Sequence, residues 1–172
     1  MLFNSSDVPS QIWQNVLHEL HRGALDPKHP FRFLTLATSG AQFPQVRTVV
    51  LRHMSPAMEF LVYTDVRTAK VRDLLETPRV SLLFYHPKKQ VQVRVKAIAT
   101  LHVEDALAQE HWKRVPEKRQ SEYKSGLVPG TRIETPDLGW ETQSESTHFS
   151  VLKFSPLSIE VLQLAREGHL RM

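Results

Sequence analysis

The stretch QVQVRVKAIATLH, residues 90–102, constrains the fold of this chain most strongly, because apolar and polar side chains alternate along it. Valine, alanine or isoleucine recurs from Val91 to Ala99, and Gln92, Arg94 and Lys96 stand between the apolar positions. An alternation of period two is typical of a β-strand, in which successive side chains point to opposite faces of the sheet. The stretch therefore predicts a strand with one face in a hydrophobic core and one face that water can reach.

Several other segments are rich in β-branched and aromatic residues, which favour strands. The segment 80–85 is almost wholly apolar, and we expect it to be buried on both faces. Short turns separate neighbouring segments, so the set predicts a mainly β fold with flanking helices, built as a six- or seven-stranded antiparallel barrel. The remaining predicted strands are residues 31–38, 46–53 and 58–64 and the C-terminal segments HFSVLKFSP and LSIEVLQL.

The predicted strands 46–53 and 58–64 form a hairpin that brings separated polar groups to one end. If its turn lies at Ser55–Pro56, antiparallel pairing places Arg47 roughly opposite Thr64. A helical period follows Thr64, so we expect Thr68 to be the N-cap of a helix and Lys70 to lie in its first turn. These four side chains and the N-terminus of the helix are therefore expected to converge.

This convergence has a chemical interpretation. A guanidinium, an ammonium group, hydroxyls and unpaired helix amides together form a site for a doubly charged phosphate group. The alternative is an ordinary solvated face, since arginine and lysine are mostly exposed in folded proteins. The pattern alone leaves both interpretations open.

Two helical regions and one irregular segment complete the pattern. Residues 8–22 predict an amphipathic helix that packs on the rest of the fold. Residues 104–125 are helical in pattern and are interrupted at Pro116. The segment 126–146 is dense in glycine, proline, threonine and serine, which predicts a long irregular loop. Within this loop, Trp140 either covers a ligand or docks onto the protein surface.

A length of 172 residues suits a single domain, residues 1–172. No apolar run is long enough to span a bilayer, no secretory signal is evident and cysteine is absent, which together predict a cytoplasmic protein. The net charge of +4 comes without a basic stripe interleaved with aromatics, which argues against nucleic-acid binding. The segment HELHR lacks the second histidine of a zinc-protease motif, so we expect no metal site.

Three motifs in the middle of the chain are similar to those of a known family. RTVVLR, FLVYTDVRTAK and LLFYHPKKQVQVRV resemble, in order and spacing, the FMN-binding split barrels typified by pyridoxamine 5'-phosphate oxidase. The resemblance is good over about residues 30–101 and loose elsewhere. It implies one FMN-binding split-barrel domain. Its expected parts are an N-terminal helix at 8–22, barrel strands at about 31–102 and 147–165, and a helical insert at 104–125.

The resemblance also assigns residues to the cofactor. It implies that Arg47 and Lys70 neutralise the phosphate of FMN, that Thr64 and Thr68 bond it, and that Gln92 meets the ribityl chain or the ring. No residue presents itself as a catalytic acid or base. The further cofactor-binding candidates are Thr48, Val49, Val50 and Tyr63, of which the two valines are expected along the flavin ring.

Several positions depart from the pattern of the true oxidase. Ala69 stands where the oxidase has an arginine, and Arg52 replaces a substrate-binding lysine. His111, Val115 and Arg119 stand where the oxidase grips the substrate phosphate with tyrosine, arginine and serine. The chain is therefore more similar to a branch described only as FMN-binding, which implies a homodimer with flavins at the subunit interface.

The resulting hypotheses differ in class. The first is an FMN-dependent oxidoreductase that acts on an unknown small molecule, with Arg52 as a candidate substrate contact and Arg171 or Trp140 reaching the flavin of the partner. The second is an FMN carrier or sensor without turnover. The third is a barrel that binds a tetrapyrrole through His53 or His148.

Overall fold

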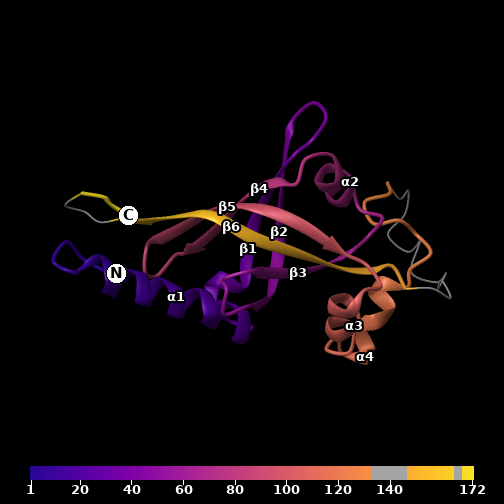
Figure 1. The fold of residues 1–172 in the computed structure, drawn as a ribbon, viewed down its shortest axis with the longest axis horizontal. Helices are drawn as coiled ribbons and strands as arrows, with labels where there is room; N and C mark the ends of the chain where they lie inside the picture. The colour runs from indigo at the N-terminus through magenta and orange to yellow at the C-terminus, as the bar shows by residue number, and fades with distance from the viewer. Residues whose placement is uncertain (133–146, 165–167) are drawn as a thin grey trace.

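The computed structural model describes residues 1–132, 147–164 and 168–172. Its strands are β1 (Phe33–Ser39), β2 (Pro44–Met54), β3 (Phe60–Asp65), β4 (Arg79–His86), β5 (Val91–His102), β6 (Phe149–Gln163) and β7 (Leu170–Arg171). They form one sheet in the order β3-β2-β1-β4-β5-β6-β7, and β3 also pairs with β6. This pairing closes the first six strands into an antiparallel barrel (Figure 1). The predicted mainly β barrel is confirmed.

The helices lie outside the barrel. They are α1 (Pro9–Leu25), α2 (Ala69–Glu76), α3 (Ala106–Trp112) and α4 (Glu117–Gln120), with the 3-10 turns η1 (Pro30–Arg32) and η2 (Ser121–Tyr123). Figure 1 shows α1 along one side of the barrel, and α3 and α4 together at the end opposite to the chain termini. Within the described residues, no helix has the length and apolarity needed to cross a membrane.

The core fills the barrel and continues under α1. Val16 and Leu20 of α1 are fully buried against it, so the apolar stripe of this helix has found its expected partner. The aromatic centre of the core consists of four fully buried rings, Phe31, Phe60, Phe84 and Phe154. Phe84 contacts both Phe31 and Phe60 edge-on or tilted, with ring centroids 5.6 and 5.4 Å apart.

Strand β5 has the predicted alternation, and β4 corrects a prediction. Every second residue of β5 from Val91 to Ala99 is buried, whereas Arg94 and Lys96 are exposed. The expectation that residues 80–85 are buried on both faces is wrong, because Tyr85 is 45% exposed. A strand in a barrel wall covers the core with alternate side chains only. The outer side chains of β4 therefore face outwards in the single chain.

The register of the β2–β3 hairpin also differs from the prediction. The turn does follow Ser55, whose carbonyl accepts the Met58 N–H at 2.9 Å. However, a bulge lies before His53, and the β2–β3 pairs run from Met54 only as far as Leu51. Arg47 pairs instead with β1, so it does not stand opposite Thr64. Arg47 nevertheless comes near Lys70, which bonds Thr64, as described next.

Candidate functional site

The turn between β3 and α2 gathers a lysine and two threonines. Lys70 Nζ donates to Thr64 Oγ1 at 2.9 Å, and Thr64 Oγ1 lies 3.4 Å from Thr68 Oγ1. Both threonines are buried, and Lys70 is half-buried. Among the described residues, no carboxylate lies within ion-pair distance of Lys70. The ammonium group therefore has the Thr64 hydroxyl as its partner and no carboxylate in contact with it.

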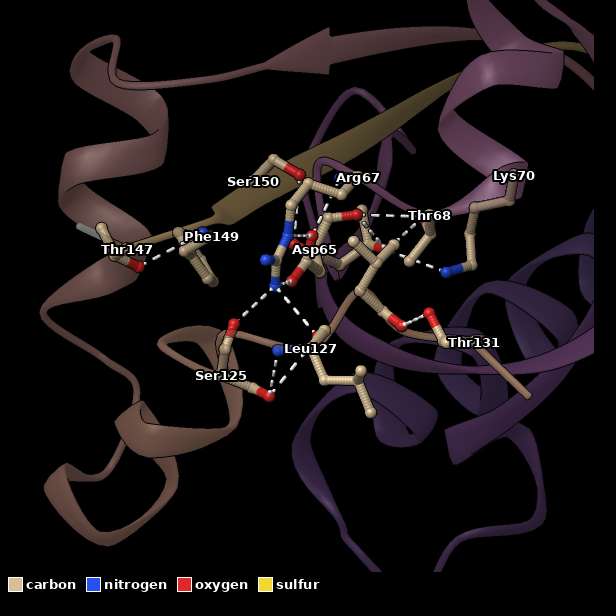
Figure 2. A network of polar contacts seen from close by, with 12 residues as sticks. Asp65, Arg67, Thr68, Lys70, Ser125, Leu127, Thr131, Thr147, Phe149 and Ser150 are labelled. Atoms are coloured by element: carbon tan, nitrogen blue, oxygen red, sulfur yellow. Dashed lines mark hydrogen bonds and ion pairs between the residues drawn. The ribbon is translucent and has the colours of Figure 1, made fainter. Parts of the chain in front are cut away.

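The turn itself is fixed by Asp65 and Arg67. The Arg67 backbone N–H donates to Asp65 Oδ1 at 2.8 Å, and the guanidinium donates to both carboxylate oxygens, at 3.0 and 2.6 Å (Figure 2). This two-point pair raises the pKa of Arg67. The same guanidinium donates to the carbonyl of Ser125 at 2.9 Å. The chain after η2 is thereby fastened to the start of α2.

The N-terminus of α2 has no side-chain cap. Thr68 occupies the predicted N-cap position, but its hydroxyl donates to the Asp65 carbonyl at 2.9 Å and makes no capping bond to the helix. The first amides of a helix have no partner within the helix and carry partial positive charge. The start of α2 thus adds hydrogen-bond donors to the charge of Lys70.

Arg47 lies beside α2 and has a partner that the sequence did not reveal. Its Nη1 donates to Thr38 Oγ1 at 2.6 Å, and its Nη2 lies 3.4 Å from Asp73 Oδ2. Thr38 Oγ1 also donates to Asp73 at 2.7 Å. Burial lowers the pKa of Lys70, and the positive charge of Arg47 lowers it further. The two cations predicted to meet are therefore close enough to repel one another.

The other predicted cofactor-binding residues lie next to this cluster along β2 and β3. Val49 is buried, Val50 is half-buried and Thr48 is exposed. Tyr63 precedes Thr64 on β3, and its hydroxyl lies 2.8 Å from His111 Nδ1. Burial raises the pKa of Tyr63 and lowers that of His111, so both are neutral near pH 7.

Gln92 and Arg171 lie elsewhere. Leu162 of β6 pairs with Gln92 on one side and with Arg171 on the other, so the two candidates share one row of the sheet. Around the closed sheet, β4 and β1 stand between β5 and β2 in one direction, and β3 stands between β6 and β2 in the other. A cavity of about 680 Å³ opens here on the outer face of β4, β5 and β6 and includes Gln92. Trp140 lies outside the described residues.

A second cavity, of about 250 Å³, lies between the barrel and the α3–α4 region. It is rich in arginine, and Arg52 is among its lining residues, with the guanidinium carbon 5.4 Å from the centre of the Tyr63 ring. Sequence reasoning had singled out Arg52 and Arg119 but not Arg32, because η1 carries no motif. The lining residues are Arg32, Arg52, Tyr63, Arg114, Val115, Pro116, Arg119, Glu122 and Tyr123.

A buried polar cluster between α1 and the barrel has ligand types that could hold a metal ion. Glu19, His29 and His86 offer ligand atoms within 4.8 Å of one another. However, backbone N–H groups donate to Nδ1 of both histidines, at 3.1 and 3.2 Å, so the neutral rings carry their protons on Nε2. Lys89 Nζ also lies 2.8 Å from Glu19 Oε2. These N–H donors satisfy the carboxylate without a metal.

Comparison with known proteins adds a family to this geometry. Residues 10–103 match the model of the family described as pyridoxamine 5'-phosphate oxidase, FMN-binding domain. Relatives named pyridoxine/pyridoxamine 5'-phosphate oxidase include that of Anaeromyxobacter dehalogenans, 35% identical over 47% of this chain, and that of Cupriavidus metallidurans, 42% identical over 42% of this chain. The matches cover only 41% and 34% of those relatives.

Solved structures agree on the fold. A pyridoxamine 5'-phosphate oxidase-related FMN-binding protein from Nostoc punctiforme superposes with a TM-score of 0.74 at 24% identity, covering 96% of this chain and 90% of that one. PhzG from Burkholderia lata, solved with tetrahydrophenazine-1-carboxylic acid, gives 0.75 at 15% identity, covering 99% and 90%. At these low sequence identities, the similarity shows only that the chains share the barrel fold.

Proposed function

Because this chain belongs to the pyridoxamine 5'-phosphate oxidase FMN-binding domain family, we propose that it binds FMN with the phosphate group at Lys70 and Arg47. The observation that carries the proposal is the half-buried Lys70 ammonium, which has the Thr64 hydroxyl as its partner and no carboxylate among the described residues. A dianionic phosphate group supplies the negative partner that the Lys70 ammonium group does not have. The buried hydroxyls of Thr64 and Thr68 and the uncapped start of α2 supply further bonds.

The flavin ring in this proposal extends from the phosphate along β2. The half-buried Val50 side chain offers apolar contact there, whereas Val49 points the other way into the core. Backbone groups of both residues offer hydrogen bonds to the polar edge of the ring. Gln92 and Arg171 lie on β5 and β7, neither of which pairs with β2 or β3. We assign them to the flavin of a second copy, in a homodimer with FMN at the subunit interface.

FMN supplies hydride or electron transfer when bound, and the chain supplies placement and a binding cavity for a second molecule. The arginine-lined cavity beside Tyr63 suits an anionic small molecule, which supports an oxidoreductase. A carrier or sensor without turnover is the second candidate. It is favoured by the replacement of the substrate-gripping positions of the oxidase by His111, Val115 and Arg119.

Removing both cations from the proposed phosphate site tests the function directly. The variant Arg47→Ala/Lys70→Ala should lose FMN, with affinity reduced at least about a hundredfold, because each charged contact contributes roughly 1.5–3 kcal/mol. The measurement is the flavin absorbance of the purified protein together with a fluorescence titration of added FMN. Arg79→Ala, an exposed arginine at the start of β4, is the matched control and should retain FMN. Equal FMN affinity in the double variant and the control would sink the proposed site.

A further inference from the structure

The arginine-lined cavity has two walls that come from different parts of the chain. The barrel contributes Arg32 from η1, Arg52 from β2 and Tyr63 from β3. The α3–α4 region contributes the opposite wall, where Arg119 of α4 and Tyr123 of η2 stand. Each wall therefore combines a guanidinium with an aromatic ring.

Three of these guanidinium groups have no acidic partner. Among the described residues, neither Arg32, Arg52 nor Arg119 forms an ion pair. Arg32 Nη1 donates only to the neutral carbonyl of Ala24, at 2.7 Å. The fourth arginine, Arg114, is paired with Glu110 at 2.5 Å.

Charge on the helical wall is not all of one sign. Glu122 is the one carboxylate among the lining residues, and no ion pair of Glu122 occurs within the described chain. Counting Arg32, Arg52 and Arg119 against Glu122, the cavity retains an excess of positive charge. An anion entering it would gain charge-assisted hydrogen bonds in a partly desolvated site.

Two observations indicate that the cavity is short of an acceptor. Arg52 Nε is buried and has no hydrogen-bond partner, although buried donors are nearly always paired. Burial lowers the pKa of Arg32, and the positive charges of Arg52 and Arg119 lower it further. Arg32 is thus repelled by both Arg52 and Arg119, a cost that a bound anion would reduce.

We propose that the cavity binds a flat, unsaturated ligand with two separate acid groups, one held by Arg32 and Arg52 on the barrel wall and the other by Arg119 on the helical wall. Tyr63, Tyr123, Val115 and Pro116 line the space between the cations and contact the body of the ligand. This deepens the proposed function, since it names the class of small molecule that the second site takes. Such a ligand joins the barrel to the α3–α4 region.

Isothermal titration calorimetry with three simple probes tests the proposal on the full chain. Isophthalate, with two separated carboxylates on a ring, should bind at least about tenfold more tightly than benzoate, which has one. It should also bind more tightly than phenyl phosphate, which carries two charges on a single group. Phenyl phosphate binding as tightly as isophthalate, or no measurable heat with isophthalate, would overturn the proposal.

Variants of each wall distinguish a ligand held by both walls from one that is attracted only by the overall positive charge of the cavity. Arg119→Gln should reduce isophthalate affinity to the level of benzoate, because the acid group on the helical wall then loses its partner. Arg32→Gln should reduce the affinity by less, because Arg52 still holds the other acid group. Arg79→Gln removes the same charge outside the cavity and should bind isophthalate like the unmodified chain. Arg119 is exposed, so its variant carries the test even if Arg32→Gln fails to fold. Unreduced affinity in Arg119→Gln contradicts the two-wall arrangement.

The result is independent of the flavin. FMN retention by Arg119→Gln with loss of isophthalate binding supports both proposals. FMN retention with no isophthalate binding by the unmodified chain refutes the ligand class and leaves the proposed function standing. Isophthalate binding by an unmodified chain that cannot retain FMN supports the ligand class and refutes the proposed function.

Discussion

Asp73 lies where a bound phosphate group would compete with it for Arg47. Its carboxylate accepts from Thr38 and lies 3.4 Å from the Arg47 guanidinium, so the three side chains form one closed set. A phosphate dianion at Lys70 would bring further negative charge close to Asp73. Asp73 therefore sets a limit on how tightly the proposed site holds FMN.

Replacing Asp73 by asparagine should raise FMN affinity, because the substitution removes a like charge and leaves Arg47 free for the phosphate. We expect roughly a fivefold lower Kd, the equivalent of about 1 kcal/mol. Fluorescence titration with FMN measures the change. Glu76→Gln removes a charge from the exposed last residue of the same helix and serves as the control. Weaker FMN binding by Asp73→Asn would show that the carboxylate orients Arg47 instead of competing for it.

At the scale of elements, α1 is held to the barrel by a charge as well as by its apolar stripe. Glu19, 2% exposed, accepts from His29 at 3.2 Å and from Lys89 at 2.8 Å. Burial by itself raises the pKa of Glu19, but the bonds from Lys89 and His29 outweigh it and the pKa is lowered. Removing one partner of such a buried pair is costly because the other charge stays uncompensated.

The pH dependence of stability follows from the signs of these shifts. Burial lowers the pKa of His86 from its usual 6.5, so below that pH the unfolded chain takes up a proton more readily than the folded one. Stability should therefore begin to fall as the pH drops through 6.5. The contribution of Glu19, whose pKa is lowered from 4.5, is present above that pH and is lost below it.

Urea unfolding at a series of pH values checks this prediction. Glu19→Gln should cost about 3 kcal/mol at pH 7 and should flatten the loss of stability below pH 4.5. Glu117→Gln, on exposed α4, should leave both the stability at pH 7 and the loss of stability below pH 4.5 unchanged. A pH profile of Glu19→Gln that parallels the unmodified chain would contradict the assigned role.

The sequence predicts those elements whose causes are local. The alternation in β5 and the spacing from Thr64 to Lys70 arise within one strand or one turn, and both predictions agree with the structure. The contact of Asp73 with Arg47 depends on how α2 docks against β1 and β2, which no local pattern encodes. Arg32 and Arg119 come to line one cavity only after η1 and α4 are placed by the whole fold.

At the scale of the molecule, the outer face of the barrel exposes several large apolar side chains. Phe33 is 57% exposed, Tyr85 45% and Leu157 66%, on strands β1, β4 and β6. The prediction that residues 80–85 are buried on both faces was wrong for the single chain. A second copy on this face would bury the outer side chains of β4.

A charge placed on this face should separate the proposed dimer. Tyr85→Glu should elute as a monomer from a sizing column with light scattering and should bind FMN less tightly, because Gln92 and Arg171 of the partner would no longer reach the flavin. Val8→Glu, at an exposed apolar residue before α1, is the matched control and should remain dimeric. A monomeric unmodified chain that still retains FMN would refute the interface.

The guanidinium of Arg67 has one further consequence. It donates to Asp65, which lies beside the proposed phosphate site. It also donates to the carbonyl of Ser125, a residue that follows the helical wall of the arginine-lined cavity in the chain. Thermal fluctuations on the two sides of this side chain cannot be independent. Occupancy of either compartment should damp amide hydrogen exchange in the other, even though the two ligands never touch.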